Sequence, residues 1–107
     1  MIINLFEQAE LDLVLREKEG QVFDRKSLRI DPRELANHYV AFANADGGVI
    51  AVGLEDDGAI SGINADEAKV NVLLQAAWTY CAPPVTLAHK FLACVNSANQ
   101  PDKILLL

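Results

Sequence analysis

Three segments of the chain repeat apolar residues at helical spacing, and each begins at a capping signal. An Asn or Asp is followed three residues later by Glu in all three, an arrangement in which the first side chain accepts from a backbone N–H at the start of a helix. The capping pairs are Asn4 with Glu7, Asp31 with Glu34, and Asn64 with Glu67. They predict helices from about Leu5 to Arg16, from Pro32 to about Ala43, and from about Ala65 to Tyr80.

Between these segments the apolar pattern is typical of strands. Residues 21–28 alternate, with Asp24 and Lys26 on one face and Arg25 on the other. Residues 49–54 are apolar on both faces, which indicates a central strand covered on both sides. We therefore expect Phe42 of the second helix to be buried, together with Val49, Ala51 and Val52. Asp57-Gly58 predicts a hairpin turn into a short strand at 59–61, and two further strands are predicted at 85–95 and 103–107.

These elements predict an α+β domain with a mixed sheet and about three helices. A chain of 107 residues is long enough for one modest core, so we expect residues 1–107 to form a single domain. The chain ends in an apolar run, Lys-Ile-Leu-Leu-Leu, and we expect it to be the amino-terminal part of a longer protein. It contains no long apolar stretch and no signal-peptide pattern, from which we expect a cytoplasmic protein that is not bound to a membrane. Cys81 and Cys94 stand alone and are predicted to be packing residues.

The net charge of −6 argues against a uniformly basic nucleic-acid-binding surface. The charges are nevertheless segregated along the chain, with the acidic residues gathered further on, from Glu55 to Glu67. A solvated, mixed-charge surface and a phosphate-binding patch both fit this distribution. The basic residues that would form such a patch lie within one short stretch: Arg16, Lys18, Arg25, Lys26, Arg29 and Arg33.

Three blocks between Glu19 and Gly62 are the most specific feature of the sequence. Glu19 is followed after four residues by Asp-Arg-Lys (24–26), then by Ala-Phe-Ala-Asn-Ala-Asp-Gly-Gly (41–48), and then by Val-Gly-Leu-Glu-Asp-Asp-Gly (52–58). The chain resembles the Schlafen/AlbA-type DNA-binding domains found in bacterial transcriptional regulators, RecG-related proteins and animal Schlafens. Asp24 stands where that family usually has Glu, and Arg25 where it usually has an aromatic residue.

The resemblance implies a nucleic-acid-binding domain, with DNA as the first ligand and contacts from the basic residues to phosphates. It also implies an alternative, a metal-dependent endoribonuclease of the Schlafen type. In the Schlafens that cut transfer RNA, three acidic residues in corresponding blocks are catalytic, and their equivalents here are Glu19, Asp24 and Asp56, with Asp57 as the alternative to Asp56. Such carboxylates would bind Mg²⁺ or Mn²⁺. A third reading is a structural or dimerisation module that pairs with a second copy of itself.

The remaining candidate residues point to no further chemistry. The glycines do not form a G-x-x-x-x-G-K-[ST] phosphate loop, so ATP binding is not expected, and nucleic-acid binding requires no cofactor. His38 and His89 lack partners at metal-ligand spacing and are predicted to be structural. Trp78 and Tyr80, near the end of the third helix, are predicted to be core residues rather than a base-stacking platform.

Overall fold

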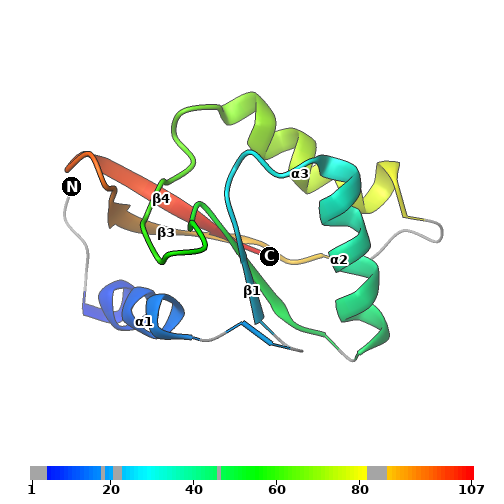
Figure 1. Ribbon diagram of the computed structural model, residues 1–107, viewed down its shortest axis with the longest axis horizontal. Coiled ribbons are helices and arrows are strands. Elements are labelled where there is room, and N and C mark those ends of the chain that lie inside the picture. Colours follow the sequence, from blue (N-terminus) through cyan, green and yellow to red (C-terminus); the bar gives the residue numbers. More distant parts are fainter. Residues whose placement is uncertain (1–4, 18, 21–22, 46, 82–86) are drawn as a thin grey trace.

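The computed structural model describes residues 5–17, 19–20, 23–45, 47–81 and 87–107, and for residues 5–8 only the backbone. These residues form three helices and a four-stranded mixed sheet, as expected for an α+β domain (Figure 1). The elements are α1 (Leu5–Arg16), β1 (Phe23–Lys26), α2 (Pro32–Asn44), β2 (Val49–Val52), α3 (Glu67–Thr79), β3 (Lys90–Val95) and β4 (Pro101–Leu106). Among them no helix is long and apolar enough to cross a membrane.

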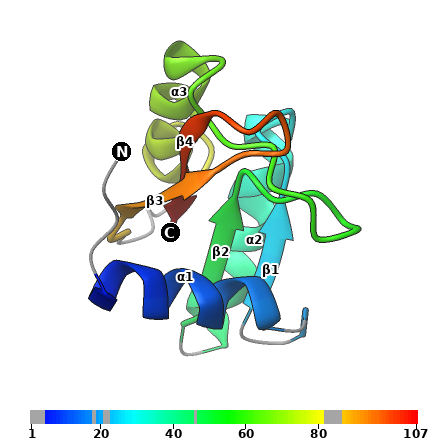
Figure 2. The same cartoon turned by 90° about the vertical axis from the view of Figure 1, so that its left-hand side faces the viewer.

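The strands are ordered β1-β2-β4-β3, with β1 and β3 at the two edges. β1 pairs with β2 in parallel, and α2 makes the crossover that a parallel pair requires. β4 pairs antiparallel with both β2 and β3. In Figure 2, α1 lies on one side of the sheet, and α2 lies behind β1 and β2 on the other.

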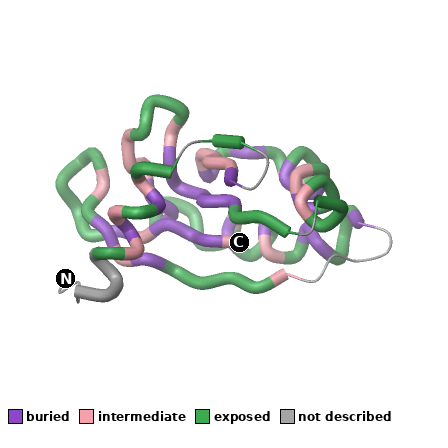
Figure 3. The backbone as a smooth tube through the Cα atoms, turned by 90° about the horizontal axis from the view of Figure 1, so that it is seen from below, coloured by how far each residue is buried: buried purple, intermediate pink, exposed green. Residues whose placement is uncertain are grey.

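Two apolar clusters cover the two faces of the sheet, and β2 contributes to both. Ile50 and Val52 pack with α2 and α3, whereas Ala51 packs on the side of α1. This confirms the prediction of a central strand buried on both faces. Figure 3 shows the same distribution along the backbone, with buried residues concentrated in the interior and exposed residues in the outer turns.

Two positions expected in the core are more exposed than the pattern predicted. Val49 begins β2 at the end of the sheet and is 38% exposed. Phe42 is only partly buried; it lies near the end of α2, where it packs against the core cluster of the sheet–helix layer and close to Gly48. A Cβ at Gly48 would lie 2.7 Å from the Phe42 ring, so glycine is required there by close approach.

The third helix differs from its prediction at its start and on its surface. Asp66, not Asn64, is the N-cap, and its carboxylate accepts from the backbone N–H of Lys69 at 3.0 Å. Trp78 is 76% exposed and Tyr80 is 44% exposed, so the prediction that both are core residues was wrong. The apolar face of α3 is instead formed by Val70, Leu73, Ala76 and Ala77.

The boundaries of the other two helices follow the predictions closely, whereas residues 27–28, 53–54 and 87–89, predicted as strand, lie outside β1, β2 and β3. α1 has its predicted bounds, and α2 ends one residue later, with the Asp31 carboxylate accepting from Arg33 N–H at 2.8 Å. The hairpin at Gly58 forms, but its return segment makes only an isolated bridge between Leu54 and Ile60. The structure does not describe Asn4, Lys18, residues 21–22 or residues 85–86, so the predictions made for them lie outside the described residues.

Candidate nucleic-acid interface

The edge strand β1 carries the acidic and basic residues of the first sequence block. In the parallel register Asp24 lies beside Ile50 and Lys26 beside Val52, so both point toward the layer of α2 and α3. Arg25 lies beside Ala51, which packs on the opposite face. The prediction that Arg25 and Lys26 lie on opposite faces is confirmed.

The carboxylate of Asp24 lies within ion-pair distance of two ionisable side chains. Its Oδ2 lies 3.3 Å from Lys26 Nζ and 3.4 Å from Nδ1 of His38 on α2. The side chains of Asp24, Lys26 and His38 are 15%, 24% and 31% exposed, so the group is sheltered but open to solvent. Sequence reasoning missed His38, because fourteen positions separate it from Asp24 and only the packing of α2 against β1 brings the two together.

Arg25 connects β1 to the end of α1. Its Nη2 donates to the backbone carbonyl of Glu17, and the Arg25 side chain is partly buried. The Nε of Arg25 is buried and has no hydrogen-bond partner within the described part of the chain. A buried guanidinium nitrogen without a hydrogen-bond partner is energetically costly.

The remaining basic residues differ in their contacts. Arg29 pairs with Glu55 at 2.7 Å, and its side chain is 78% exposed. The Arg33 guanidinium lies 5.3 Å from the centroid of the Tyr80 ring, a cation–π contact that leaves its N–H donors available. Arg16 donates from Nε to the carbonyl of Asp12 at 3.1 Å. Lys18 lies outside the described residues.

The three acidic residues implied by the resemblance do not form a metal-binding group. Glu19 and Asp56 are exposed, and the Asp24 carboxylate is already engaged by Lys26 and His38. Asp57 accepts from the backbone N–H of Ala59 at 2.9 Å, as a turn residue. Within the described ranges no three His, Cys, Asp or Glu side chains gather closely enough to bind a metal ion. Within the described residues these carboxylates do not form the group that a shared Mg²⁺ or Mn²⁺ requires, and their role as metal ligands stays a prediction.

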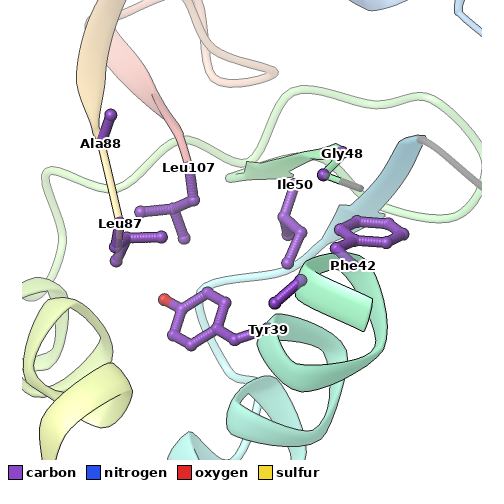
Figure 4. Close-up of a pocket in the computed structure, with 9 residues that line it drawn as sticks. Tyr39, Phe42, Gly48, Ile50, Leu87, Ala88 and Leu107 are labelled. Carbon is purple, nitrogen blue, oxygen red and sulfur yellow. The ribbon is translucent and has the colours of Figure 1, made fainter. Parts of the chain in front are cut away.

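A pocket of about 280 Å³ lies at the other end of α2, and its lining is apolar (Figure 4). Tyr39, Phe42, Ile50 and Leu107 are among the residues that line it. The Tyr39 hydroxyl donates to the carbonyl of Leu73 at 2.9 Å, and burial raises the pKa of this phenol. Among the described residues that line this pocket none has a charged side chain.

The most buried charge is Asp102, which the sequence pattern placed in a loop. It lies on β4, is 4% exposed, and accepts hydrogen bonds from the backbone of Ile63, Asn64 and Lys103 and from Asn96 Nδ2, at 2.7–3.0 Å. Burial by itself raises the pKa of Asp102, but these hydrogen bonds outweigh it and lower the pKa below its usual value. All its contacts are internal, so Asp102 is structural.

The two thiols are structural as well. Cys81 and Cys94 are free and buried, as the isolated cysteines predicted. Burial, together with the charge of Asp102, raises the pKa of Cys94 to about 11. The thiol is therefore protonated at neutral pH and is unreactive as a nucleophile.

Comparison with known proteins identifies a matching family. A family model described as Schlafen, AlbA_2 matches residues 19–107, which include β1, α2, β2 and the turn after β2. No curated protein and no solved structure matches the chain.

Proposed function

Because the chain belongs to the Schlafen, AlbA_2 family, we propose that it binds nucleic acid along the β1 edge of the sheet, through the phosphate backbone. DNA is the first ligand to test, in keeping with the resemblance to bacterial regulators and RecG-related proteins. Backbone contacts give affinity with little sequence preference, so RNA is a ligand of the same surface.

One observation carries this proposal: consecutive segments of the chain, from the end of α1 to the first turn of α2, each carry basic side chains. The end of α1 meets β1 through the contact between Arg25 and the Glu17 carbonyl. Lys26 lies at the end of β1, Arg29 in the following loop and Arg33 in the first turn of α2. Residues 16–34 carry six basic and five acidic side chains, whereas the chain as a whole carries a charge of −6.

The acidic residues near this edge neutralise it only in part. Glu55 pairs with Arg29 and Asp24 with Lys26, whereas Arg33 has no carboxylate partner among the described residues. Arg33 is therefore the basic residue best placed to bind a phosphate without breaking an existing ion pair.

The test compares Arg33→Glu with Lys103→Glu. Lys103 on β4 also lies over an aromatic ring, 4.8 Å from the centroid of Phe91, so both substitutions remove a cation–π contact and change the charge equally. Binding to labelled single-stranded DNA, duplex DNA and RNA is measured by anisotropy at two or more salt concentrations.

We expect Arg33→Glu to weaken binding and to reduce the slope of log K against log salt by about 0.9 for duplex DNA, the value of one lost phosphate contact. Lys103→Glu should leave the slope unchanged. Equal effects of the two substitutions would place the ligand elsewhere. An absence of binding by the unmodified chain at low salt would favour the third reading, a structural or dimerising module.

The geometry does not favour the metal-dependent endoribonuclease. That function needs three carboxylates close enough to share an ion, and Glu19, Asp24 and Asp56 do not provide such a group.

A further inference from the structure

A pocket of about 440 Å³ lies between the loop that follows β1 and the start of α3. Its volume falls within the range of about 300–1,000 Å³ that is typical of ligand sites. Polar and charged side chains line it from both sides, in contrast to the apolar pocket of Figure 4. They are Ser27 and Arg29 from the loop, Ser61 from the segment after β2, and Asp66 and Lys69 from the beginning of α3.

Two cationic side chains of this pocket have hydrogen-bond donors that the described part of the chain does not use. The Lys69 ammonium has no ion-pair partner among the described residues, and Lys69 is partly exposed. The Arg29 guanidinium uses one nitrogen for Glu55, at 2.7 Å, and its other N–H groups are left for a second acceptor. Sequence reasoning did not include Lys69 among the basic candidates, because it lies far along the chain from Arg29 and only folding brings both to one pocket.

The two serine hydroxyls of the pocket differ in what they can bind. Ser61 Oγ donates to the carbonyl of Gly53 at 3.1 Å, so its hydrogen is already used. Ser27 Oγ accepts from the backbone N–H of Arg29 at 3.1 Å, and its own hydrogen has no acceptor within the described ranges. Ser27 therefore adds a neutral donor to the charged donors of Arg29 and Lys69.

Asp66 is the acidic residue among those that line the pocket. Its carboxylate caps α3 by accepting from the backbone N–H of Lys69 at 3.0 Å, so the start of the helix is already satisfied from within the chain. Its charge opposes an anion in the pocket, and Glu55 offsets part of the charge of Arg29 from outside it. Two cationic residues and one acidic residue nevertheless line the pocket, which favours an anionic ligand.

We propose that this pocket binds the terminal phosphate of a nucleic-acid strand, an inference that rests on the proposed binding of nucleic acid along β1. A phosphate monoester carries a charge of about −1.5 to −2 at pH 7 and three acceptor oxygens, which match the donors of Ser27, Arg29 and Lys69. A phosphate inside the strand carries a single charge, and the strand must lead both into and out of the site. A strand end enters a pocket through a single ester bond. Because Arg29 belongs to both the basic stretch and the pocket, a strand that follows β1 past Lys26 reaches the pocket with its end.

The experiment compares three forms of one single-stranded DNA sequence: with a 5′-phosphate, with a 3′-phosphate, and with hydroxyls at both ends. Each form competes with a labelled strand for the whole chain, and anisotropy is measured at low salt. We expect one phosphorylated form to bind about tenfold more tightly than the hydroxyl form, the gain from one additional hydrogen bond to a charged group. The end that gains affinity also gives the direction of the strand along β1.

Three substitutions locate the phosphate. Lys69→Gln should remove the difference between the phosphorylated and hydroxyl strands, because it removes an ammonium group of the pocket. Lys103→Gln is the matched control and should keep the difference, since Lys103 is also partly exposed but lies in a different pocket, beside Phe91. Asp66→Asn removes the opposing charge and keeps a side-chain oxygen for the helix cap, so it should increase the difference.

Free phosphorylated molecules carry the same terminal group, so AMP and inorganic phosphate are added as further competitors. We expect both to compete only at much higher concentration than the phosphorylated strand, because they lack the contacts along β1. AMP that binds as tightly as the phosphorylated strand would overturn the strand end as the ligand and assign the pocket to a small phosphorylated molecule.

The remaining outcomes separate the two proposals. Equal affinities of the phosphorylated and hydroxyl strands overturn this inference and leave the proposed binding along β1 intact. A preference for the phosphorylated strand that persists in Lys69→Gln also overturns it. If no strand binds, with or without a terminal phosphate, both proposals fail.

Discussion

Asp24 and Asp102 are both sheltered aspartates on strands of one sheet, yet their partners differ in kind. Asp102 on β4 accepts from backbone and amide N–H groups that cannot titrate, and it is 4% exposed. Asp24 on the edge strand β1 faces a lysine and a histidine, and its side chain is 15% exposed. A carboxylate satisfied by fixed internal donors holds the fold together, whereas one that holds ionisable, solvent-accessible partners is available for chemistry.

The two edge strands of the sheet, β1 and β3, also differ from each other. β1 is short and charged, which discourages pairing with another strand. β3 is longer and exposes Phe91 and Val95, but its far end is anchored through β4 by Asp102 and Asn96. We therefore expect changes near Asp102 to alter stability and changes near Asp24 to alter function.

The largest expected effect is on folding stability. Asp102→Ala leaves the buried N–H of Ile63 without its acceptor and should lower the free energy of unfolding by more than about 3 kcal/mol. Asp24→Ala removes only partly exposed ion pairs and should cost about 1 kcal/mol or less. Urea denaturation of the two variants measures the difference. Equal losses of unfolding free energy would contradict the proposed difference between the two aspartates.

A second pair of substitutions tests the packing around Asp102. Gly62 has φ +76°, and a Cβ at this position would overlap the Asp102 carboxylate. Gly58 has φ +88° in the hairpin turn, with open space around it. Gly58→Ala should cost about 1–2 kcal/mol from backbone conformation alone, and Gly62→Ala should cost clearly more. Thermal unfolding of both variants compares them, and similar melting temperatures would contradict the close packing.

The contribution of the Asp102 charge to stability should also depend on pH. Its pKa is lowered in the folded protein, so its stabilisation is fully present above the ordinary carboxyl pKa of about 3.9 and is lost as pH falls through the lowered value. We expect the difference in unfolding free energy between the unmodified chain and Asp102→Asn to be constant near neutrality and to shrink below about pH 4. A difference that does not change in acid would show that the charge of Asp102 is unimportant.

The smallest expected effect concerns ligand binding at the charged edge. Glu55→Gln releases Arg29 and should strengthen DNA binding by at most about 1 kcal/mol, the scale of an exposed ion pair. Glu10→Gln is the matched control, because Glu10 pairs with Lys90 on the β3 edge. Anisotropy titrations at low salt should separate the two variants, and an equal gain would indicate a general charge effect rather than binding along β1.

The local patterns predicted most elements because each depends on neighbouring residues. Asp31 and Pro32 define the start of α2, and the doubly apolar run of β2 indicates a strand covered on both sides. The same patterns misplaced Trp78, because an aromatic residue near the end of a helix has the same spacing whether or not another element covers it. They also placed Asp102 in a loop, because a polar residue is expected to be exposed unless its buried hydrogen-bond donors are known.

Some features of the candidate site could likewise be predicted from the sequence, whereas others depend on the tertiary structure. The sequence by itself determined the family blocks, the basic stretch and the opposite orientation of Arg25 and Lys26, since these follow from residue order and the two-residue period of a strand. Only the tertiary structure decided that His38 meets Asp24, that Glu19 and Asp56 do not, and that Asp102 is buried among four donors. The contacts of Asp24 with His38 and of Asp102 with Ile63 join residues 14 and 39 positions apart, and they depend on how α2 and the β2–α3 connection pack against the sheet.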